Sequence, residues 1–201
     1  MTKNNTYQNC VIEKVLALSV EKKNYDLAKR EWEYRGEVID HGPLKDQIPK
    51  PAECEFCGHK IRYGYRLHNI VNQKTVEVGS ECIGNYLEIT PALASALDAD
   101  KRAARKRRKN EQIKMRRDLY NAALAELRKV RIAICAIDNC QRDRNYILSA
   151  GNNASTLYSA FASGEIDRLA ENYGVILDQQ KINAFLDEAG KLKPVDRISA
   201  F

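Results

Sequence analysis

The sequence contains no long apolar run, and no stretch approaches the roughly 18 apolar residues that a membrane-spanning helix requires. Its first residues, MTKNNTYQNC, also lack the charged and then apolar pattern of a secretion signal. We therefore expect a cytoplasmic protein. A hydrophobic content of 44% over 201 residues is enough for a packed core, so the composition excludes a disordered or collagen-like chain.

Disulfide bonds are not expected, although the chain has six cysteines. In a reducing compartment, the Cys-x-x-Cys step at Cys54 and Cys57 indicates metal binding or redox chemistry instead. A thioredoxin-like motif would open a helix after a buried strand. Cys54 instead follows the segment QIPKPAE, whose prolines disfavour a helix, so the metal interpretation is preferred.

Motifs of common catalytic sites are also missing: there is no Gly-rich phosphate loop, no His-Glu-x-x-His and no nucleophile elbow. Zinc deaminases place a His-x-Glu or Cys-x-Glu pair before a Pro-Cys-x-x-Cys step, and both the order and the spacing differ here. An enzyme with an open zinc position would have to use Glu53, Glu55 or Glu81 as its general base. We predict that the protein is not an enzyme.

The chain is predicted to be α+β overall and mainly α, in three segments. Residues 1–50 form an N-terminal helical unit, residues 51–90 a small zinc-stabilised β-hairpin module, and residues 91–201 a long basic helix followed by a C-terminal helical region. The hairpin module is expected to be of the treble-clef or zinc-ribbon type. Because a hairpin of this size buries little, removal of the ion should unfold it locally.

Within the first segment, Val11 to Arg35 has the apolar spacing of one or two helices. Asn24 is the predicted N-cap of the second helix, and Leu27 and Trp32 are its predicted anchors. The sequence YRGEVID that follows indicates a short strand.

The hairpin module has a clear local pattern. Lys60 to Asn69 alternates and is rich in β-forming residues, and Thr75 to Val78 can return as a second strand. Gly79 then ends the strand, and Ser80 is a good N-cap for a short helix with Cys82 in its first turn. We predict the order knuckle, hairpin, helix.

A long helix, or two with a bend, is predicted after Pro91, because no Gly or Pro occurs from Ala92 to Ala150. Its second half has an apolar stripe at helical spacing, which predicts a buried face. The stripe consists of Met115, Leu119, Ala123, Leu127, Val130, Ile134 and Ile137. It vanishes when extended backwards through the basic segment, so those turns should face solvent or a charged partner.

Short helices divided by Gly164, Gly174 and Gly190 are expected after Gly151. Their predicted core residues are Leu157, Phe161, Ile166, Leu169, Tyr173, Ile182, Phe185 and Leu186.

Three cysteines form the candidate zinc site. The thiolates of Cys54 and Cys57 can converge on one ion, and Gly58 permits the tight turn that points backbone N–H groups at sulfur. Cys82 follows 25 residues after Cys57, at a helix start where free N–H groups favour a thiolate. A knuckle, a hairpin and a helix start around zinc resemble a treble clef. The competing interpretation is three reduced core cysteines.

The sequence does not identify the fourth zinc ligand. A treble clef usually supplies it three residues after the third cysteine, where this chain has Asn85, a poor zinc ligand. A hairpin turn at Asn72–Gln73 would place Gly79 opposite Arg66. Cys82 would then lie near Tyr63, at the end of the knuckle. We favour His59 on this register over His68, and the remaining candidates are His41, Glu81, Cys135, Cys140 and water.

These residues are similar to a known cysteine module. The run CEFCGHKIRYGYRLHNIVNQKTVEVGSECIGNYL resembles the pattern Cys-x-x-Cys-Gly … Val-Gly-Ser-x-Cys-Ile of uncharacterised bacteriophage and mobile-element proteins. The resemblance covers about 35 residues, with Glu31 to Asp40 as a possible extension. It implies a shared zinc module, a phage origin and residence in the host cytoplasm, and it carries no established activity.

Positive charge is concentrated in one segment. The segment from Lys101 to Arg117 contains ten basic residues and one acid, so its net charge is +9. Because the whole chain carries +6, the rest of the chain carries −3. Like charges at this density repel along a helix and favour phosphate contacts. The ten are Lys101, Arg102, Arg105, Lys106, Arg107, Arg108, Lys109, Lys114, Arg116 and Arg117.

The hairpin can add to this basic surface. Arg62 and Arg66 share one face of the predicted strand and can contact phosphates, while Tyr63 and Tyr65 lie on the other face. An exposed tyrosine could stack on a base, and a buried one would pack beneath the hairpin. We predict nucleic-acid binding, to RNA or DNA, without strong sequence preference.

A protein-binding role is the main alternative. The helical regions could present a surface to an acidic host protein, as an inhibitor or adaptor that blocks a host enzyme or defence complex without catalysis. The sequence does not choose between RNA, DNA and an acidic protein surface.

The metal prediction can be tested by elemental analysis. We expect about one zinc ion per chain, because one cluster of thiolates can hold one ion. Cys82→Ser should lose the ion because it removes one of three thiolates. A fully folded wild-type protein without metal would refute the site.

Overall fold

The computed structural model describes residues 3–47, 49–86, 91–136 and 141–201. They form two compact units, Met1–Arg108 and Lys109–Phe201. This division differs from the three predicted segments, because the N-terminal helices, the cysteine module and the first turns of the long helix share one core.

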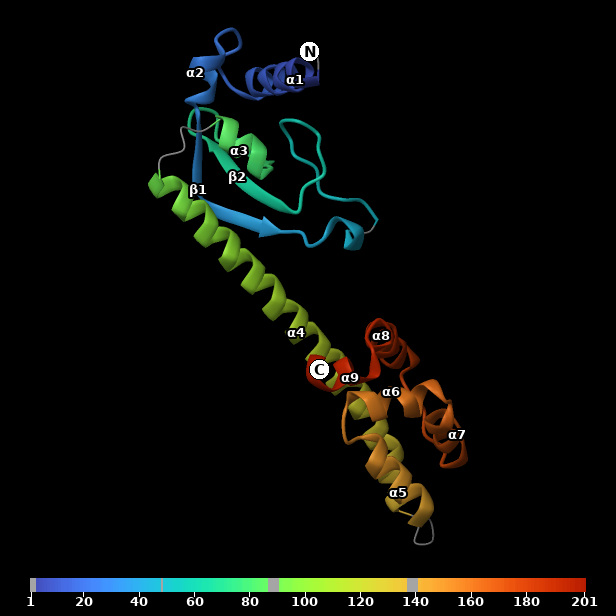
Figure 1. Ribbon diagram of the computed structural model, residues 1–201. Helices are drawn as coiled ribbons and strands as arrows, with labels where there is room; N and C mark the ends of the chain where they lie inside the picture. The colour runs from blue at the N-terminus through green and yellow to red at the C-terminus, as the bar shows by residue number, and fades with distance from the viewer. Residues whose placement is uncertain (1–2, 48, 87–90, 137–140) are drawn as a thin grey trace. The chain divides into compact units, whose positions relative to one another are not determined.

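The first unit combines helices with one small sheet (Figure 1). Its sheet is three-stranded and antiparallel, in the order β1-β2-β3. The prediction of a mainly helical α+β chain is therefore confirmed, and the short strand predicted at YRGEVID joins the two hairpin strands in this sheet. The elements in chain order are α1 (Lys3–Leu18), α2 (Tyr25–Lys29), β1 (Trp32–Asp40), the 3₁₀ turn η1 (Leu44–Asp46), β2 (Tyr63–Asn69), β3 (Thr75–Val78), α3 (Ser80–Tyr86) and the start of α4 (Pro91–Cys135).

The N-terminal prediction is confirmed at the cap and wrong at the end of the second helix. Asn24 caps α2, and its side chain accepts a hydrogen bond from the Leu27 amide at 3.2 Å. The helix ends at Lys29, so Trp32 begins β1 and is not a helical anchor. Leu27 is half exposed, and Ala28 is the buried residue of α2 instead.

The hairpin has the predicted strands but a register that differs by two residues. Leu67 pairs with Val76 and His68 with Thr75, so the turn is centred one residue earlier than Asn72–Gln73. Continued along this register, Gly79 comes opposite Gly64 and not opposite Arg66. A shift of two residues preserves the face of every side chain, and the buried face is therefore as expected.

One core holds the first unit together. Phe56, between the two knuckle cysteines, is 1% exposed and meets Trp32 edge to face, with ring centroids 5.8 Å apart. The Trp32 indole N–H donates to Ser19 Oγ at 2.7 Å, at the end of α1. The knuckle is therefore packed into the same core as the N-terminal helices, and it is not held by its ligands alone.

The first turns of α4 belong to this core as well, which corrects the expectation that the basic turns have little to bury. Leu97 and Ala104 are buried in it, one on each side of Asp100. The Tyr34 hydroxyl donates to Asp100 Oδ2 at 2.7 Å, and the Arg107 guanidinium donates to the Val38 carbonyl at 3.0 Å. These contacts fix one face of the helix against β1 (Figure 1).

The second unit is entirely helical in its described residues. Ala123, Leu127, Val130 and Ile134 of α4 are buried, as the stripe predicted, whereas Met115 is exposed and Ile137 lies outside the described residues. Six of the predicted C-terminal core residues are buried, and Tyr173 and Leu186 are partly buried. The remaining helices are α5 (Gln141–Ala150), α6 (Ala154–Ala162), α7 (Glu165–Asn172), α8 (Gln179–Gly190) and α9 (Pro194–Ala200).

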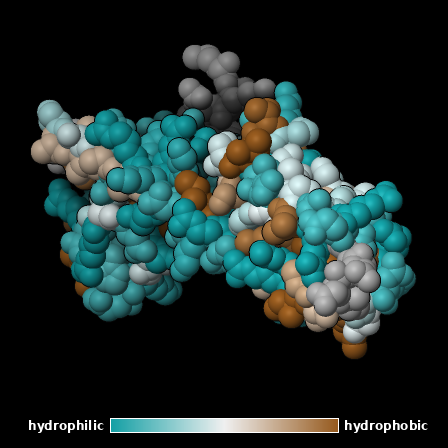
Figure 2. All heavy atoms as spheres, turned by 90° about the horizontal axis from the view of Figure 1, so that it is seen from below, coloured by the Kyte–Doolittle hydropathy of each residue, from teal (hydrophilic) through white to brown (hydrophobic). Residues whose placement is uncertain are grey.

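The surface is mainly hydrophilic. Figure 2 shows hydrophilic residues over most of the face in view, with hydrophobic residues in separate small groups. Among the described helices, none combines the length and the hydrophobicity needed to span a membrane.

Removal of the Phe56 ring should test whether the knuckle belongs to the common core. Phe56→Ala is expected to lower the free energy of unfolding of the first unit by about 3–5 kcal/mol, the usual cost of truncating a buried aromatic residue. Val71→Ala, at a 56% exposed position of the hairpin turn, is the control and should change it by less than about 0.5 kcal/mol. Equal effects of the two substitutions in denaturant titrations would contradict the shared core.

Candidate metal centre

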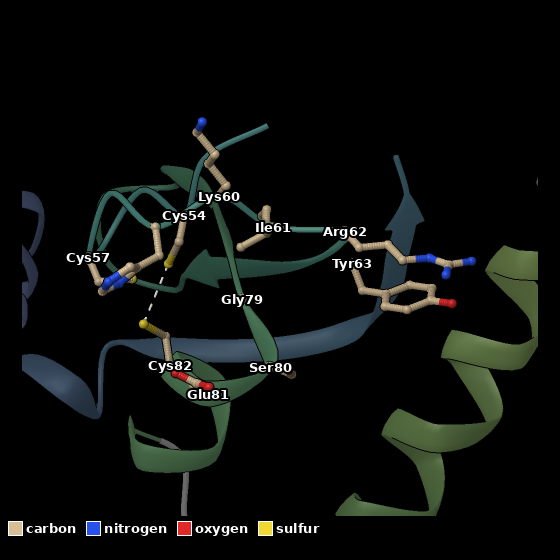
Figure 3. A pocket seen from close by; sticks show the side chains of 11 residues that line it. Cys54, Cys57, Lys60, Ile61, Arg62, Tyr63, Gly79, Ser80, Glu81 and Cys82 are labelled. Atoms are coloured by element: carbon tan, nitrogen blue, oxygen red, sulfur yellow. Dashed lines mark hydrogen bonds between the residues drawn. The ribbon is translucent and has the colours of Figure 1, made fainter. Parts of the chain in front are cut away.

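Three sulfur atoms converge at one end of the first unit. The Sγ atoms of Cys54, Cys57 and Cys82 all lie within 4.8 Å of one another, and those of Cys54 and Cys82 are 3.5 Å apart (Figure 3). Cys54 and Cys82 are buried and Cys57 is partly buried. The structure therefore brings together the three cysteines that the sequence analysis selected.

The sulfur spacing fits a shared metal ion. Two thiolates bound to one tetrahedral zinc at about 2.3 Å lie roughly 3.8 Å apart. A disulfide would require about 2.05 Å between the sulfurs, and all three thiols are free. Soft thiolate ligands suit zinc and other soft ions. The cluster can hold a metal, and zinc is one ion that its donors suit.

The knuckle turn positions its first cysteine through the backbone. The Gly58 amide donates to the Cys54 carbonyl at 2.7 Å, and Gly58 has φ +74°, a left-handed conformation that favours glycine. The amides of Phe56 and Cys57 also donate to the Cys54 sulfur. Amide donors aimed at sulfur stabilise a thiolate, which is the form that binds metals.

The ionisation of the cluster agrees with this geometry. The hydrogen bond between Cys54 and Cys82, supported by the amides of Gly79, Cys57 and Phe56, lowers the pKa of Cys54 to about 5 despite its burial. Burial raises the pKa of Cys57, although the amide of His59 opposes this effect. One thiol of the cluster is therefore ionised well below neutral pH, and a cation would favour ionisation of the others.

Cys82 is delivered by the end of β3 and the start of α3. The Ile83 amide donates to the Gly79 carbonyl at 3.0 Å, which closes the first helical turn around Cys82. A Cβ on Gly79 would lie 2.9 Å from Cγ2 of Ile61, so any other residue here would have to displace the Ile61 side chain. The predicted glycine break and helix start are thus the features that bring the third sulfur to the knuckle.

No fourth His, Cys, Asp or Glu donor of the described chain lies within 4.8 Å of all three sulfurs. His59 is the nearest of the predicted alternatives: its Nδ1 lies 3.3 Å from the Cys57 sulfur, outside the common group. His68 instead contacts Thr75 and Gln73. Of the remaining candidates, His41 pairs with Glu77, and Glu81 lines the adjoining pocket. Cys135 belongs to the second unit, and Cys140 lies outside the described residues.

A pocket adjoins the cluster. It has a volume of about 320 Å³ and contains the three cysteines in its lining, together with the polar residues His59, Lys60, Arg62, Tyr63, Ser80 and Glu81. Figure 3 shows Arg62 and Tyr63 directed away from the sulfurs, toward α4. Of the three cysteines that line the pocket, only Cys57 is partly exposed.

The predicted basic residues are separated into two groups by the fold. Lys101 lies over the Tyr63 ring at 4.9 Å, Arg108 lies 4.0 Å from Asp40, and Arg116 pairs with Glu188 in the second unit. With Arg107, these residues make contacts within their own unit. The others, Arg102, Arg105, Lys106, Lys109, Lys114 and Arg117, are exposed.

The hairpin residues are also partly engaged. Arg62 pairs with Asp40 at 3.2 Å and Arg66 with Glu37 at 2.7 Å. Tyr65 is 3% exposed and belongs to the core, which is the packing alternative considered for it. Tyr63 is partly buried, and Arg62 and Lys101 each lie 4.9 Å from the centroid of its ring. A base could not stack on Tyr65 without unfolding the sheet.

Asp40 is a structural residue that the sequence gave no reason to select. Its side chain is 2% exposed and accepts hydrogen bonds from the Gly42 amide and from Arg62, with Arg108 at 4.0 Å. It thereby joins two basic residues that are far apart in the sequence. A lone aspartate at the end of a short strand carries no pattern that could have revealed this.

Comparisons with known proteins give no relative for this chain. No protein family, curated protein or solved structure matches it.

Metal removal should loosen the cluster and leave the sheet. On chelation, we expect faster hydrogen exchange at the amides of Cys54, Gly58 and Ile83, because their turns enclose the sulfurs. Exchange at Leu67 and Val76 in the paired strands should stay slow, because the shared core holds them without the ion. Equal acceleration at both sets of amides would show that the ion holds the whole unit.

Proposed function

We propose that the protein is a zinc-containing nucleic-acid-binding protein that contacts phosphates through the exposed basic face of α4, without catalysis. The observation that carries the proposal is the exposure of Arg102, Arg105 and Lys106. Within the described ranges, these three side chains form no ion pair. Basic side chains without an internal counter-charge favour a polyanionic partner.

The geometry of α4 supports a directed surface. At 3.6 residues per turn, Arg102, Arg105 and Lys106 lie on one side of the helix, and Ala104 lies about 200° from Arg102 on the other. Since Ala104 is buried against the first unit, the three cations point outward. The contacts of Asp100 and Arg107 with β1 fix the rotation of the helix.

The metal centre has a structural role in this proposal. Three thiolates with the knuckle geometry favour zinc, and the order of knuckle, hairpin β2–β3 and helix α3 supports a treble-clef-like module. The ion would stabilise the end of the sheet where β3 leads into α3. The resemblance to bacteriophage cysteine modules supports a phage origin and residence in the host cytoplasm.

Salt dependence tests the proposal directly. Binding to a nucleic-acid duplex or single strand in gel-shift assays should weaken by about 10³-fold between about 50 and 200 mM salt if six or more phosphates are engaged. The combined change of Arg102, Arg105 and Lys106 to Glu should abolish binding, because it reverses the exposed face and spares Arg107 and Arg108, which contact β1 and Asp40.

A matched control is available in the same unit. Lys23, Lys45 and Lys74 are exposed and lie outside α4, and their combined change to Glu alters the net charge equally. This control should retain most of the binding. Absence of binding at low salt would reject the proposal. A stoichiometric, nuclease-resistant complex with a host protein would favour the inhibitor or adaptor alternative.

A further inference from the structure

We propose that the end of the sheet where β2 turns into β3 is a contact surface for an anionic lipid bilayer. Three aliphatic side chains, each about half exposed, define this turn patch: Val20, Ile70 and Val71. The turn patch contains none of the three cysteines and no residue of α4. The inference therefore goes beyond the proposed function and does not depend on it.

The fold brings the two turns of the patch together. Glu31 accepts a hydrogen bond from the Val20 amide through its side chain and one from the Ile70 amide through its carbonyl, both at 2.7 Å. The Asn72 side chain donates to the Leu18 carbonyl at 2.9 Å, so the hairpin turn also contacts the end of α1. In Figure 1 this end of β2 lies next to α2. The two turns form one surface, although they are far apart in the sequence.

Polar contacts build the hairpin turn and leave its aliphatic side chains outside. The Asn69 side chain accepts hydrogen bonds from the amides of Val71 and Asn72, both at 2.9 Å. Val71 is 56% exposed, Val20 53% and Ile70 48%. Isolated aliphatic side chains on a surface are ordinary, but neighbouring ones mark a contact surface for a protein or a membrane.

Basic residues surround the turn patch. The segments 19–31 and 69–75 together contain five basic and three acidic residues, a net charge of +2. Lys23, Arg30 and Lys74 are exposed, and they form no ion pair within the described ranges. One of the three acids is buried. The turn patch is therefore an apolar surface with a positive border.

This combination matches the chemistry of an anionic bilayer. Lipid phosphates can receive the basic side chains while the acyl chains beneath them receive the aliphatic ones. A nucleic acid offers phosphates without an apolar layer, so it would leave the aliphatic side chains in water. The turn patch fits a lipid surface on which the protein lies without spanning it.

Vesicle sedimentation of the full chain tests the proposal. Vesicles of phosphatidylglycerol and phosphatidylcholine should bind the protein at least about tenfold more tightly than vesicles of phosphatidylcholine alone, because anionic headgroups attract the basic border. The combined change Val20→Ser, Ile70→Ser and Val71→Ser should weaken binding to the anionic vesicles by about tenfold or more. Burial of roughly two methylene groups in the acyl layer is worth that factor.

A matched control uses exposed aliphatic residues elsewhere in the chain. Leu44, Ile176 and Val195 are 47%, 91% and 72% exposed, and their combined change to Ser should leave vesicle binding as in wild type. Both triple variants should bind nucleic acid as wild type does, because they retain the basic residues of α4.

A tryptophan placed in the turn patch reports insertion independently of affinity. The one natural tryptophan, Trp32, is buried. In Val71→Trp, lipids brominated on their acyl chains should quench the added fluorescence when the vesicles bind. In Leu44→Trp, at an exposed position outside the patch, the added fluorescence should stay unquenched.

Three results would overturn the proposal, and each leaves the proposed function standing. If wild type does not bind the anionic vesicles, the turn patch is not a lipid surface, and a protein partner is favoured for it. If the patch variant binds the vesicles as tightly as wild type, charge alone holds them. If the tryptophan at position 71 is not quenched on bound vesicles, the patch does not enter the bilayer.

Discussion

Two buried sulfur atoms 3.5 Å apart are the constraint around which the knuckle and the start of α3 are arranged. If both sulfurs were ionised, they would repel each other at this distance, and a shared cation would relieve the repulsion. The cysteines come from two turns, the knuckle and the start of α3, and each turn is anchored in the sheet core by a neighbour, Phe56 beneath one and Ile83 beneath the other. A metal ion held by these cysteines would therefore stabilise the same arrangement as the core.

The same unit decides which basic residues of α4 are available to a partner. Two acids connect α4 to β1. Asp40 of β1 lies near Arg108 of α4, and Asp100 of α4 accepts a hydrogen bond from Tyr34 of β1. Basic residues on the side of α4 that contacts β1 stabilise the fold, and basic residues on the opposite side are exposed to solvent. The proposed phosphate contacts follow from this partition, because the exposed side holds charge that the described protein does not neutralise.

Much of the local structure could be predicted from the sequence, because glycine, proline and apolar spacing act over a few residues. The knuckle, the strands of the hairpin and the glycine break before Cys82 are examples. Tertiary contacts could not be predicted. The strand at YRGEVID was predicted, but its start was not: Trp32 was assigned to the preceding helix because the start of β1 is defined by its pairing with β2. The hairpin register was two residues wrong because the turn sequence does not specify its centre, and Arg107 and Asp40 find their partners only after folding.

The central claim is that Cys54, Cys57 and Cys82 bind one metal ion together. X-ray absorption at the zinc edge of the purified full chain measures this most directly. The account predicts three protein sulfur neighbours at about 2.3 Å from the zinc, and loss of that shell in a protein in which all three cysteines are changed to Ser. A purified chain that binds no zinc when zinc is supplied, or a zinc shell made of nitrogen and oxygen alone, would contradict it.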